Sequence, residues 1–250
     1  RDRLRSRGLG DVYKRQKYTK IPFLERGIFM IQAVIFDMDG VLFDTEQVMK
    51  EGWLKAGKEL NFQLTEKHLG QMRGGSSEQN AALFQKWFEG KIDYHRARSI
   101  RSQYLSDYIE KHSVPEKKGL QEIVTYLTQE QIPWAVATST PRKRASHYWE
   151  LADIAKFMTA SVCGDEVQHS KPNPEIFLEA AQKLRIPPQN CLIVEDSING
   201  LKAGKAANGV TCMVPDLTPY TAALEPFCDY VCKDLTQVIA LISSQKFIKF

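Results

Sequence analysis

Short apolar runs rich in β-branched residues recur along the chain, and stretches with helical spacing separate them. Each run predicts a strand buried inside a sheet. The predicted strands cover residues 31–36, 134–137, 159–163, 191–194, 210–214 and 230–231. The clearest predicted helices cover residues 119–130, 174–184, 197–207 and 235–242. Strands that alternate with such helices predict an α/β fold, a doubly wound parallel sheet that forms a Rossmann-like core.

Residues 46–112 interrupt this alternation. Strand signals are absent there, and apolar residues recur at helical spacing. Glycines break the pattern within residues 73–76 and near Gly90. We therefore expect three or four helices that form an all-helical domain, inserted into a core made of residues 30–45 and 113–250. The aromatic residues that we assign to the interior of this insert are Trp53, Trp87 and Phe88.

The net charge of +4 is confined to one end of the chain. Residues 1–29 hold nine Lys or Arg and three Asp or Glu, so residues 30–250 have a net charge of −2. A core without a basic excess does not favour a nucleic-acid partner. No apolar stretch approaches the roughly 20 residues that span a membrane. Residues 1–29 also lack the apolar centre of a signal peptide, and we expect a non-native or disordered leader before a start at Met30.

The five cysteines form no C-x-x-C pair, and three of them lie inside apolar runs. This usage is typical of buried, structural thiols in a reduced, cytoplasmic protein. Paired Cys and His spacings of the kind that hold zinc are absent. We expect a monomer that acts on a small molecule, with no nucleic acid or membrane as partner.

Polar residues follow three of the predicted strands directly. They are Asp37 and Asp39, Thr138 and Thr140, and Glu195 and Asp196. The carboxyl ends of parallel strands face one crevice, so these side chains should meet in one pocket. Four carboxylates in one place repel one another unless a cation is present. Oxygen ligands without a His or Cys cluster favour Mg²⁺ over zinc, and a magnesium site of this kind is typical of enzymes that act on phosphate esters.

The pair formed by Asp37 and Asp39 suits phosphoryl chemistry. One aspartate can attack phosphorus, and a second can protonate the leaving alcohol. A spacing of two places both side chains on the same side of an extended strand end, and Gly40 allows the turn that follows. The alternative is a surface turn or a calcium loop, but the further acidic ligands of a calcium loop do not follow.

Four motifs, in order, resemble those of the haloacid dehalogenase-like hydrolase superfamily. They are DMDGVLFDT at residues 37–45, Thr138 at a strand end, KPNPEIF at residues 171–177 and VEDSING at residues 194–200. The resemblance extends over residues 30–250. A helical insert between the first and second motifs is similar to the cap of the phosphoglycolate phosphatase and β-phosphoglucomutase branch, which closes over the site and selects the substrate.

This resemblance implies a role for each matching residue. Asp37 is the nucleophile, Asp39 is the general acid and base, and both ligate Mg²⁺, Asp39 through its backbone carbonyl. Asp196 is a further metal ligand, supported by Glu195. Thr138 binds the transferring phosphoryl group. Lys171 offsets the charge of Asp37 and of the phosphate. We assign substrate contacts to Thr138, Ser139 and Lys171, and we add Arg73 in the glycine-rich loop between the insert helices.

Each assignment has a structural alternative. The alternative for Thr138 is a helix cap, although Thr140, just before Pro141, is the better candidate for that cap. Lys171 and Arg73 are also compatible with solvated side chains. Glu195 can be structural, and Asp44 is assigned to the turn rather than to the reaction.

Departures from the mutase pattern favour a phosphatase. A β-phosphoglucomutase of this branch is expected to carry a His twelve residues after the nucleophile, where this chain has Met49. It is also expected to carry an Arg near Ser77, and Arg73 lies four residues earlier. We expect a Mg²⁺-dependent phosphatase of a small phosphorylated sugar or related metabolite. A phosphotransferase of the mutase type is the alternative, and a non-catalytic phosphate-binding module is a third possibility.

Overall fold

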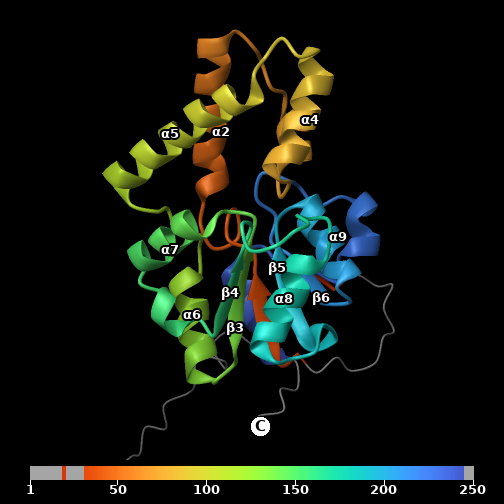
Figure 1. The fold of residues 1–250 in the computed structure, drawn as a ribbon. Helices are drawn as coiled ribbons and strands as arrows, with labels where there is room; N and C mark the ends of the chain where they lie inside the picture. Colours follow the sequence, from red (N-terminus) through yellow and green to blue (C-terminus); the bar gives the residue numbers. More distant parts are fainter. Residues whose placement is uncertain (1–18, 21–30, 245–250) are drawn as a thin grey trace, which may run out of the picture.

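A computed structural model describes residues 31–244 and the residue pair 19–20 (Figure 1). Six parallel strands form the centre, in the order β7-β6-β5-β2-β3-β4. These strands are β2 (Ala33–Phe36), β3 (Trp134–Thr138), β4 (Ala160–Cys163), β5 (Cys191–Glu195), β6 (Val210–Met213) and β7 (Tyr230–Val231). Strand β1 (Thr19–Lys20) pairs antiparallel with β7. The sequence analysis did not expect this strand, and the rest of the leader lies outside the described residues.

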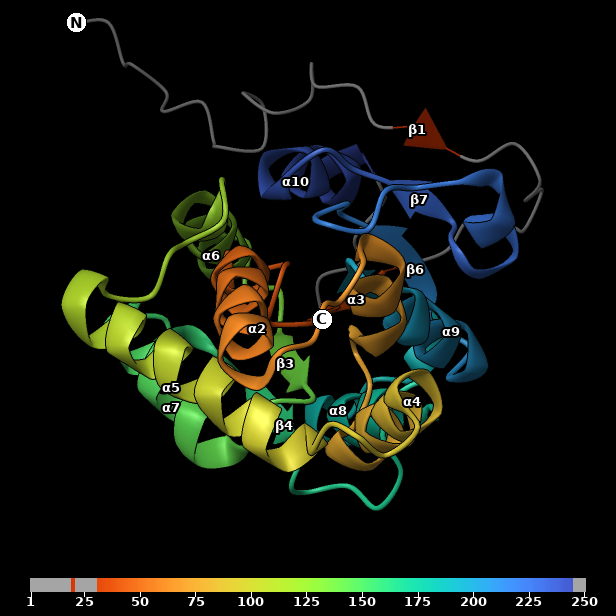
Figure 2. The ribbon, with the colours of Figure 1, turned by 90° about the horizontal axis from the view of Figure 1, so that it is seen from above.

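Helices cover both faces of the sheet, because its side chains alternate and are apolar on each side. Val34 and Phe36 point toward the face packed by α6 (Leu120–Gln129), α7 (Arg142–Leu151) and α10 (Leu235–Ser244). Ala33 and Ile35 point toward α8 (Glu175–Leu184) and α9 (Ile198–Ala206). Figures 1 and 2 show the sheet between these two layers. The predicted doubly wound α/β core is therefore confirmed.

The strand order places a switch point between β2 and β5. The chain builds outward from β2 through β3 to β4 and then returns to add β5, β6 and β7 on the other side. Ile35 pairs with Ile193 across this boundary. Ligands of open α/β sheets bind outside the carboxyl ends of the strands at such a point. Strands β3 and β5 each extend one residue beyond prediction, so they end on Thr138 and Glu195.

A block of four helices stands over that edge of the sheet (Figure 1). It consists of α2 (Thr45–Leu60), α3 (Glu66–Met72), α4 (Ser77–Phe88) and α5 (Tyr94–His112). We call these helices and their connecting loops the helical block. Its own core surrounds the fully buried Phe84, whose ring lies 5.6 Å from that of Trp53. Trp87 and Phe88 pack against the same core, as predicted.

Shorter elements and buried thiols complete the described part of the chain. Three 3-10 helices cover Ala155–Phe157, Pro188–Asn190 and Ala222–Phe227. All five cysteines are buried and unpaired, which agrees with their predicted structural role. Within residues 31–244, none of the helices combines the length and apolar character needed to span a membrane.

Candidate active site

The loop after β2 brings the first motif against the end of β5. The backbone N–H of Gly40 donates to the carbonyl of Phe43 at 2.8 Å, and that of Leu42 donates to Met38 at 2.9 Å. Gly40 has a φ of +87°, and a Cβ there would lie 2.4 Å from Oδ2 of Asp196. Glycine is required for both reasons: the left-handed backbone and the close approach to the carboxylate.

A buried lysine joins the ends of three strands. Lys171 is 1% exposed, and its ammonium donates to Asp37 Oδ1 at 2.5 Å, to Glu195 Oε1 at 2.7 Å and to the carbonyl of Ala137 at 3.1 Å. A fully buried cation needs such partners to offset its lost hydration. Lys171 is therefore not a solvated loop side chain, and the structure places it against the predicted nucleophile.

Burial governs the protonation of this group. It raises the pKa of Asp37 well above its ordinary value, although Lys171 opposes the shift, and the nearby Glu195 adds to it. Burial likewise raises the pKa of Asp196, again with Glu195 adding to the shift. Burial alone would lower the pKa of Lys171, but Asp37 and Glu195 together raise it. The carboxylates outnumber the single buried ammonium, so the site has an unmet demand for positive charge.

The carboxylates fit a hard divalent cation. Ligand atoms of Asp37, Glu195 and Asp196 lie within 4.8 Å of one another. Oδ2 of Asp196 is buried and has no hydrogen-bond partner among the described residues, which is costly for a carboxylate unless a ligand completes the site. All-oxygen donors of this kind suit Mg²⁺.

Glu195 is already engaged at both oxygens. Oε1 accepts from Lys171, and Oε2 accepts from the backbone N–H groups of Asp196 and Ser197, both at 3.0 Å, and from the Ser197 hydroxyl at 2.9 Å. A Cβ at Gly200 would lie 1.7 Å from Oε1, so glycine leaves room for this carboxylate. These bonds orient Lys171 and the turn into α9, and they leave Glu195 less free than Asp196 to bind a metal.

Asp39 lies beside this cluster and is held by two hydroxyl groups. Thr45 Oγ1 donates to Asp39 Oδ1 at 2.5 Å, and Thr140 Oγ1 donates to Oδ2 at 2.7 Å. The prediction that Thr140 caps the next helix is therefore wrong. Pro141 is the N-cap of α7, without a side-chain cap bond, because the β3 loop turns the Thr140 hydroxyl toward the β2 loop instead.

Thr138 and Ser139 line the same pocket at the end of β3. The buried Thr138 hydroxyl accepts from the backbone N–H of Thr140 at 3.1 Å, ahead of the first turn of α7. It does not act as the cap of that helix. The Ser139 hydroxyl donates to the carbonyl of Gly74, in the loop before α4, at 3.3 Å.

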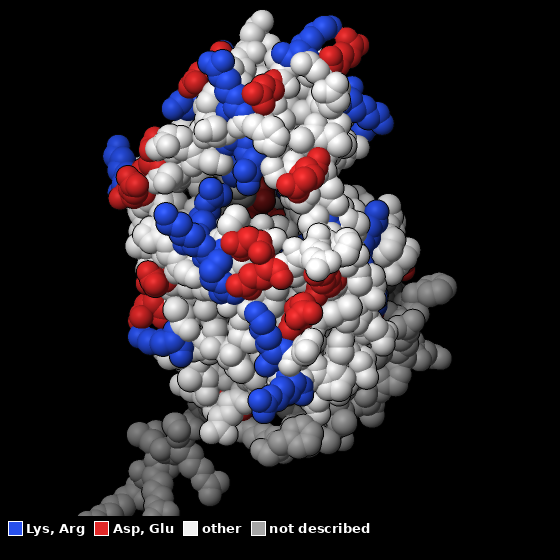
Figure 3. All heavy atoms as spheres, in the orientation of Figure 1, with Lys and Arg blue, Asp and Glu red and all other residues white. Residues whose placement is uncertain are grey.

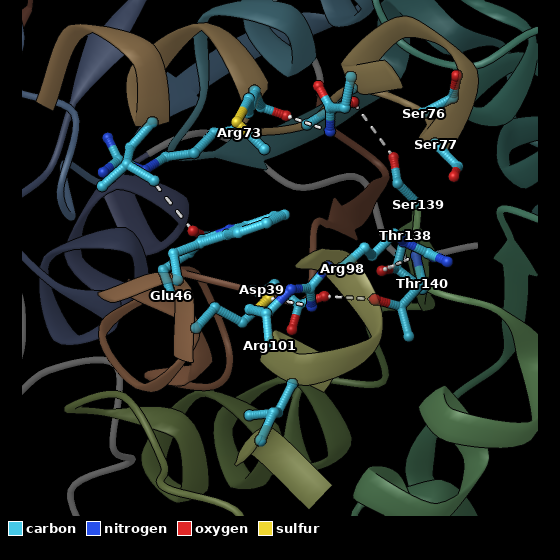
Figure 4. Close-up of a pocket in the computed structure, with 18 of the residues that line it drawn as sticks. Asp39, Glu46, Arg73, Ser76, Ser77, Arg98, Arg101, Thr138, Ser139 and Thr140 are labelled. Carbon is cyan, nitrogen blue, oxygen red and sulfur yellow. Dashed lines mark hydrogen bonds and ion pairs between the residues drawn. The ribbon is translucent and has the colours of Figure 1, made fainter. Parts of the chain in front are cut away.

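The helical block forms the opposite wall of the pocket (Figure 4). The hollow between the block and the sheet is visible in Figure 3, with acidic atoms deep inside it and basic atoms beside it. Its empty volume is about 1040 Å³, including the part open to solvent, which suits a small ligand. The charged residues of this wall are Glu46, Lys50, Arg73, Arg98 and Arg101, joined by Arg144 from α7.

Arg73 lies in this wall and is bound to protein groups. It is buried, so it is not the solvated side chain of the alternative interpretation. Its Nη1 donates to Thr218 Oγ1 at 3.1 Å, and its Nε lies 3.6 Å from Glu46 Oε2. Its carbonyl accepts from the Asn199 side chain at 2.9 Å. Arg73 therefore links the helical block to the core, in addition to facing the pocket.

Sequence reasoning missed several residues that line the pocket, among them Glu46 and Arg101. Burial, together with repulsion from Asp39, raises the pKa of Glu46 to about 7. Arg101 lies on the buried face of α5, at helical spacing from Tyr94 and Leu105. An arginine at an otherwise apolar position of an amphipathic helix is a signal that could have identified it.

Comparison with known proteins agrees with this architecture. The model of the haloacid dehalogenase-like hydrolase family matches residues 31–208. The phosphorylated carbohydrates phosphatase of Thermotoga maritima is 29% identical over 181 residues, which are 71% of this chain and 82% of that protein.

Two solved structures share the fold. CbbY from Rhodobacter sphaeroides, in complex with phosphate, has a TM-score of 0.71 at 20% identity, covering 84% of this chain and 96% of that one. The β-phosphoglucomutase of Clostridium difficile has a TM-score of 0.70 at 22% identity, covering 84% and 93%. The resemblance seen in the four motifs is confirmed by the family match, and this chain belongs to the haloacid dehalogenase-like hydrolases.

Proposed function

We propose that this hydrolase is a Mg²⁺-dependent phosphatase that removes phosphate from a small phosphorylated sugar or related metabolite through an aspartyl-phosphate. The observation that carries the proposal is the pairing of Asp37 with the buried Lys171 at the switch point of the sheet. The similarity to a phosphatase of phosphorylated carbohydrates supports the same reaction class.

Asp37 is the proposed nucleophile. Lys171 occupies its Oδ1, and no described residue donates a hydrogen bond to its Oδ2. Oδ2 attacks phosphorus, and the bond from phosphorus to the substrate oxygen breaks as the bond to Asp37 forms. The positive charge of Lys171 offsets part of the charge that collects on the phosphoryl oxygens. Thr138 and Ser139 are proposed to hydrogen-bond the same group, and Arg73 to contact the rest of the substrate.

Asp39 is the proposed general acid and base. In the first step it gives a proton to the departing alcohol oxygen. In the second it takes a proton from the water that attacks the aspartyl-phosphate, which releases phosphate and restores Asp37. Thr45 and Thr140 hold its carboxylate in place between the steps.

Asp37, Asp196 and the backbone carbonyl of Asp39 are the proposed metal ligands, with Glu195 completing the acidic set. A bound Mg²⁺ would supply positive charge to the transferring phosphoryl group. The unpartnered Oδ2 of Asp196 supports this assignment.

The helical block is proposed to act as a cap, residues 46–112, over a catalytic core of residues 30–45 and 113–250. A cap that excludes water protects the aspartyl-phosphate until the alcohol has left. The five buried, unpaired cysteines support a reducing compartment such as the cytoplasm, where we propose that the chain works as a monomer on a small molecule.

Phosphate release across a panel of sugar phosphates, with Mg²⁺ and with chelator, tests the proposal. We expect Mg²⁺-dependent release that Asp37→Asn abolishes, while the exposed Asp107→Asn leaves it unchanged. Conversion of β-glucose 1-phosphate to the 6-phosphate in the presence of a sugar bisphosphate, without phosphate release, would show the mutase alternative instead. Met49, which faces the pocket where that branch is expected to carry a histidine, favours the phosphatase.

A further inference from the structure

Three arginines in the pocket wall have no carboxylate of the described residues within ion-pair distance. Arg98 and Arg101 lie on α5 and Arg144 lies on α7, and all three line the pocket that contains Asp37. Within residues 31–244, none of them forms an ion pair. Arg73 differs, because its guanidinium lies beside Glu46 and bonds Thr218. Glu46 acts on Arg101, and Glu78 on Arg98, only from beyond ion-pair distance. The wall therefore holds guanidinium groups that no described carboxylate contacts directly.

Arg101 makes this imbalance most evident. It is 9% exposed, and its Nε is buried with no hydrogen-bond partner in the described part of the chain. Its Nη1 donates to the Met49 sulfur at 3.1 Å, and its guanidinium lies 5.3 Å from the ring centre of Trp53. A thioether is a weak acceptor, and an aromatic face replaces only part of the lost hydration. A buried cation with such partners is costly unless an anion joins it.

Arg98 and Arg144 are both close enough to Arg101 for their positive charges to act on it. Burial lowers the pKa of Arg101 to about 10, and the like charges of Arg144 and Arg98 add to the shift. Figure 4 shows Arg98 and Arg101 extending from α5 into the pocket, on the side of Asp39. The pocket thus has an acidic floor at the strand ends and a basic wall on α5 and α7.

We infer that the substrate carries a second anionic group, a carboxylate or a second phosphate, which Arg98, Arg101 and Arg144 bind while the first phosphate lies at Asp37. This inference rests on the proposed phosphatase function and adds the chemical class of the substrate. Arginine forks suit both anions, because they donate two parallel hydrogen bonds to either.

Matched substrate pairs test the second anion. Phosphoglycolate carries a carboxylate where 2-hydroxyethyl phosphate carries a hydroxymethyl group. The same exchange distinguishes 3-phosphoglycerate from glycerol 3-phosphate. Fructose 1,6-bisphosphate and fructose 6-phosphate differ in a phosphate. We expect the doubly anionic member of at least one pair to have a kcat/KM higher by about tenfold or more, the effect of one charged hydrogen bond. The pair that shows it distinguishes the carboxylate from the phosphate.

Variants assign the effect to the arginines. Arg101→Gln should lower kcat/KM by about tenfold for the doubly anionic substrate and by less than about twofold for its partner. Arg98→Gln and Arg144→Gln, at half-buried positions, give the same test if Arg101→Gln does not fold. Arg96→Gln is the matched control, because Arg96 is exposed on the same helix and outside the pocket.

Two results would overturn the inference. One is equal kcat/KM for both members of every pair. The other is an equal loss on both members in Arg101→Gln, which would mean that the arginines serve the transferred phosphate. Calorimetric binding of the same pairs to Asp37→Asn with Mg²⁺ applies both criteria without turnover. Failure to release phosphate even from p-nitrophenyl phosphate would instead refute the proposed function.

Discussion

The two walls of the pocket differ in how their charges are satisfied. At the strand ends, Lys171 bonds Asp37 and Glu195, and Glu195 also accepts three hydrogen bonds from the turn into α9. On the helical side, the buried Arg101 and the half-buried Glu46 have only weak or distant partners. The sheet wall is held in one geometry by its own contacts. The charges of the helical wall are balanced instead by the inferred second anion of the substrate. This division suits an enzyme whose core performs one reaction and whose helices select the substrate.

The largest expected effect is at the centre of the sheet wall. Lys171→Met leaves the buried carboxylates of Asp37 and Glu195 without their cation. We expect a loss of about 3–5 kcal/mol in the free energy of unfolding, the usual result of removing one partner of a buried pair. Urea denaturation measures it. Lys118→Met is the control: Lys118 is exposed and pairs with Asp234, so solvent screens the pair and the variant should lose far less stability than Lys171→Met. Similar losses in both variants would show that Lys171 is not what holds the sheet wall in one geometry.

The next largest effect is expected at Glu46, on the helical wall, and concerns how the free energy of unfolding depends on pH. Its pKa is raised to about 7 from an ordinary 4.5. The unfolded chain therefore releases this proton at lower pH than the folded protein does, so the folded state loses stability as the pH rises from about 4.5 to about 7. Glu46→Gln should make the protein more stable relative to wild type at pH 8 than at pH 4.5, by about 3 kcal/mol. Denaturation at both pH values measures this, with exposed Glu59→Gln as control. A pH-independent difference would contradict it.

A smaller effect is expected on catalysis where the strand-end loops meet. Thr140→Val removes one of the two hydroxyls that hold Asp39. Removing a hydrogen bond to a charged group is worth about 1.5 kcal/mol, so kcat should fall about tenfold while KM changes little. Steady-state kinetics beside Thr125→Val, an exposed position on α6, provides the comparison. If KM rises and kcat is unchanged, Thr140 acts on substrate binding and not on Asp39.

The smallest effect concerns the contact between the walls. Thr218→Val removes the acceptor of the Arg73 Nη1 bond and should lower the free energy of unfolding by about 1 kcal/mol. It also tests the predicted substrate role of Arg73, because a released guanidinium that still contacts substrate should leave KM within about twofold of wild type, while Arg73→Gln raises it by about tenfold. The exposed Thr221→Val is the control. Equal KM values in all these variants would show that Arg73 only joins the block to the core.

Much of the sheet wall could be predicted from sequence, because its residues follow directly from the strands that carry them. Asp37, Thr138 and Glu195 lie at or next to strand ends, and parallel strands bring their carboxyl ends to one edge. Lys171 was found through its motif, since its loop position alone favours a solvated side chain. Thr140 was misassigned, because its position before Pro141 is typical of a helix cap, and nothing local shows that Asp39 offers a stronger acceptor.

Local periodicity and the order of elements are enough to predict the alternation of strands and helices, the run of helices within residues 46–112 and the acidic strand ends. Which buried charges are paired depends instead on how the chain packs. Lys171 and Glu195 are 24 residues apart, Asp37 and Lys171 are 134 apart, and Arg73 and Thr218 are 145 apart. Contacts over such separations arise from packing, which no local pattern encodes. For the same reason, the unpartnered arginines of the helical wall became visible only once the helices and the sheet were placed together.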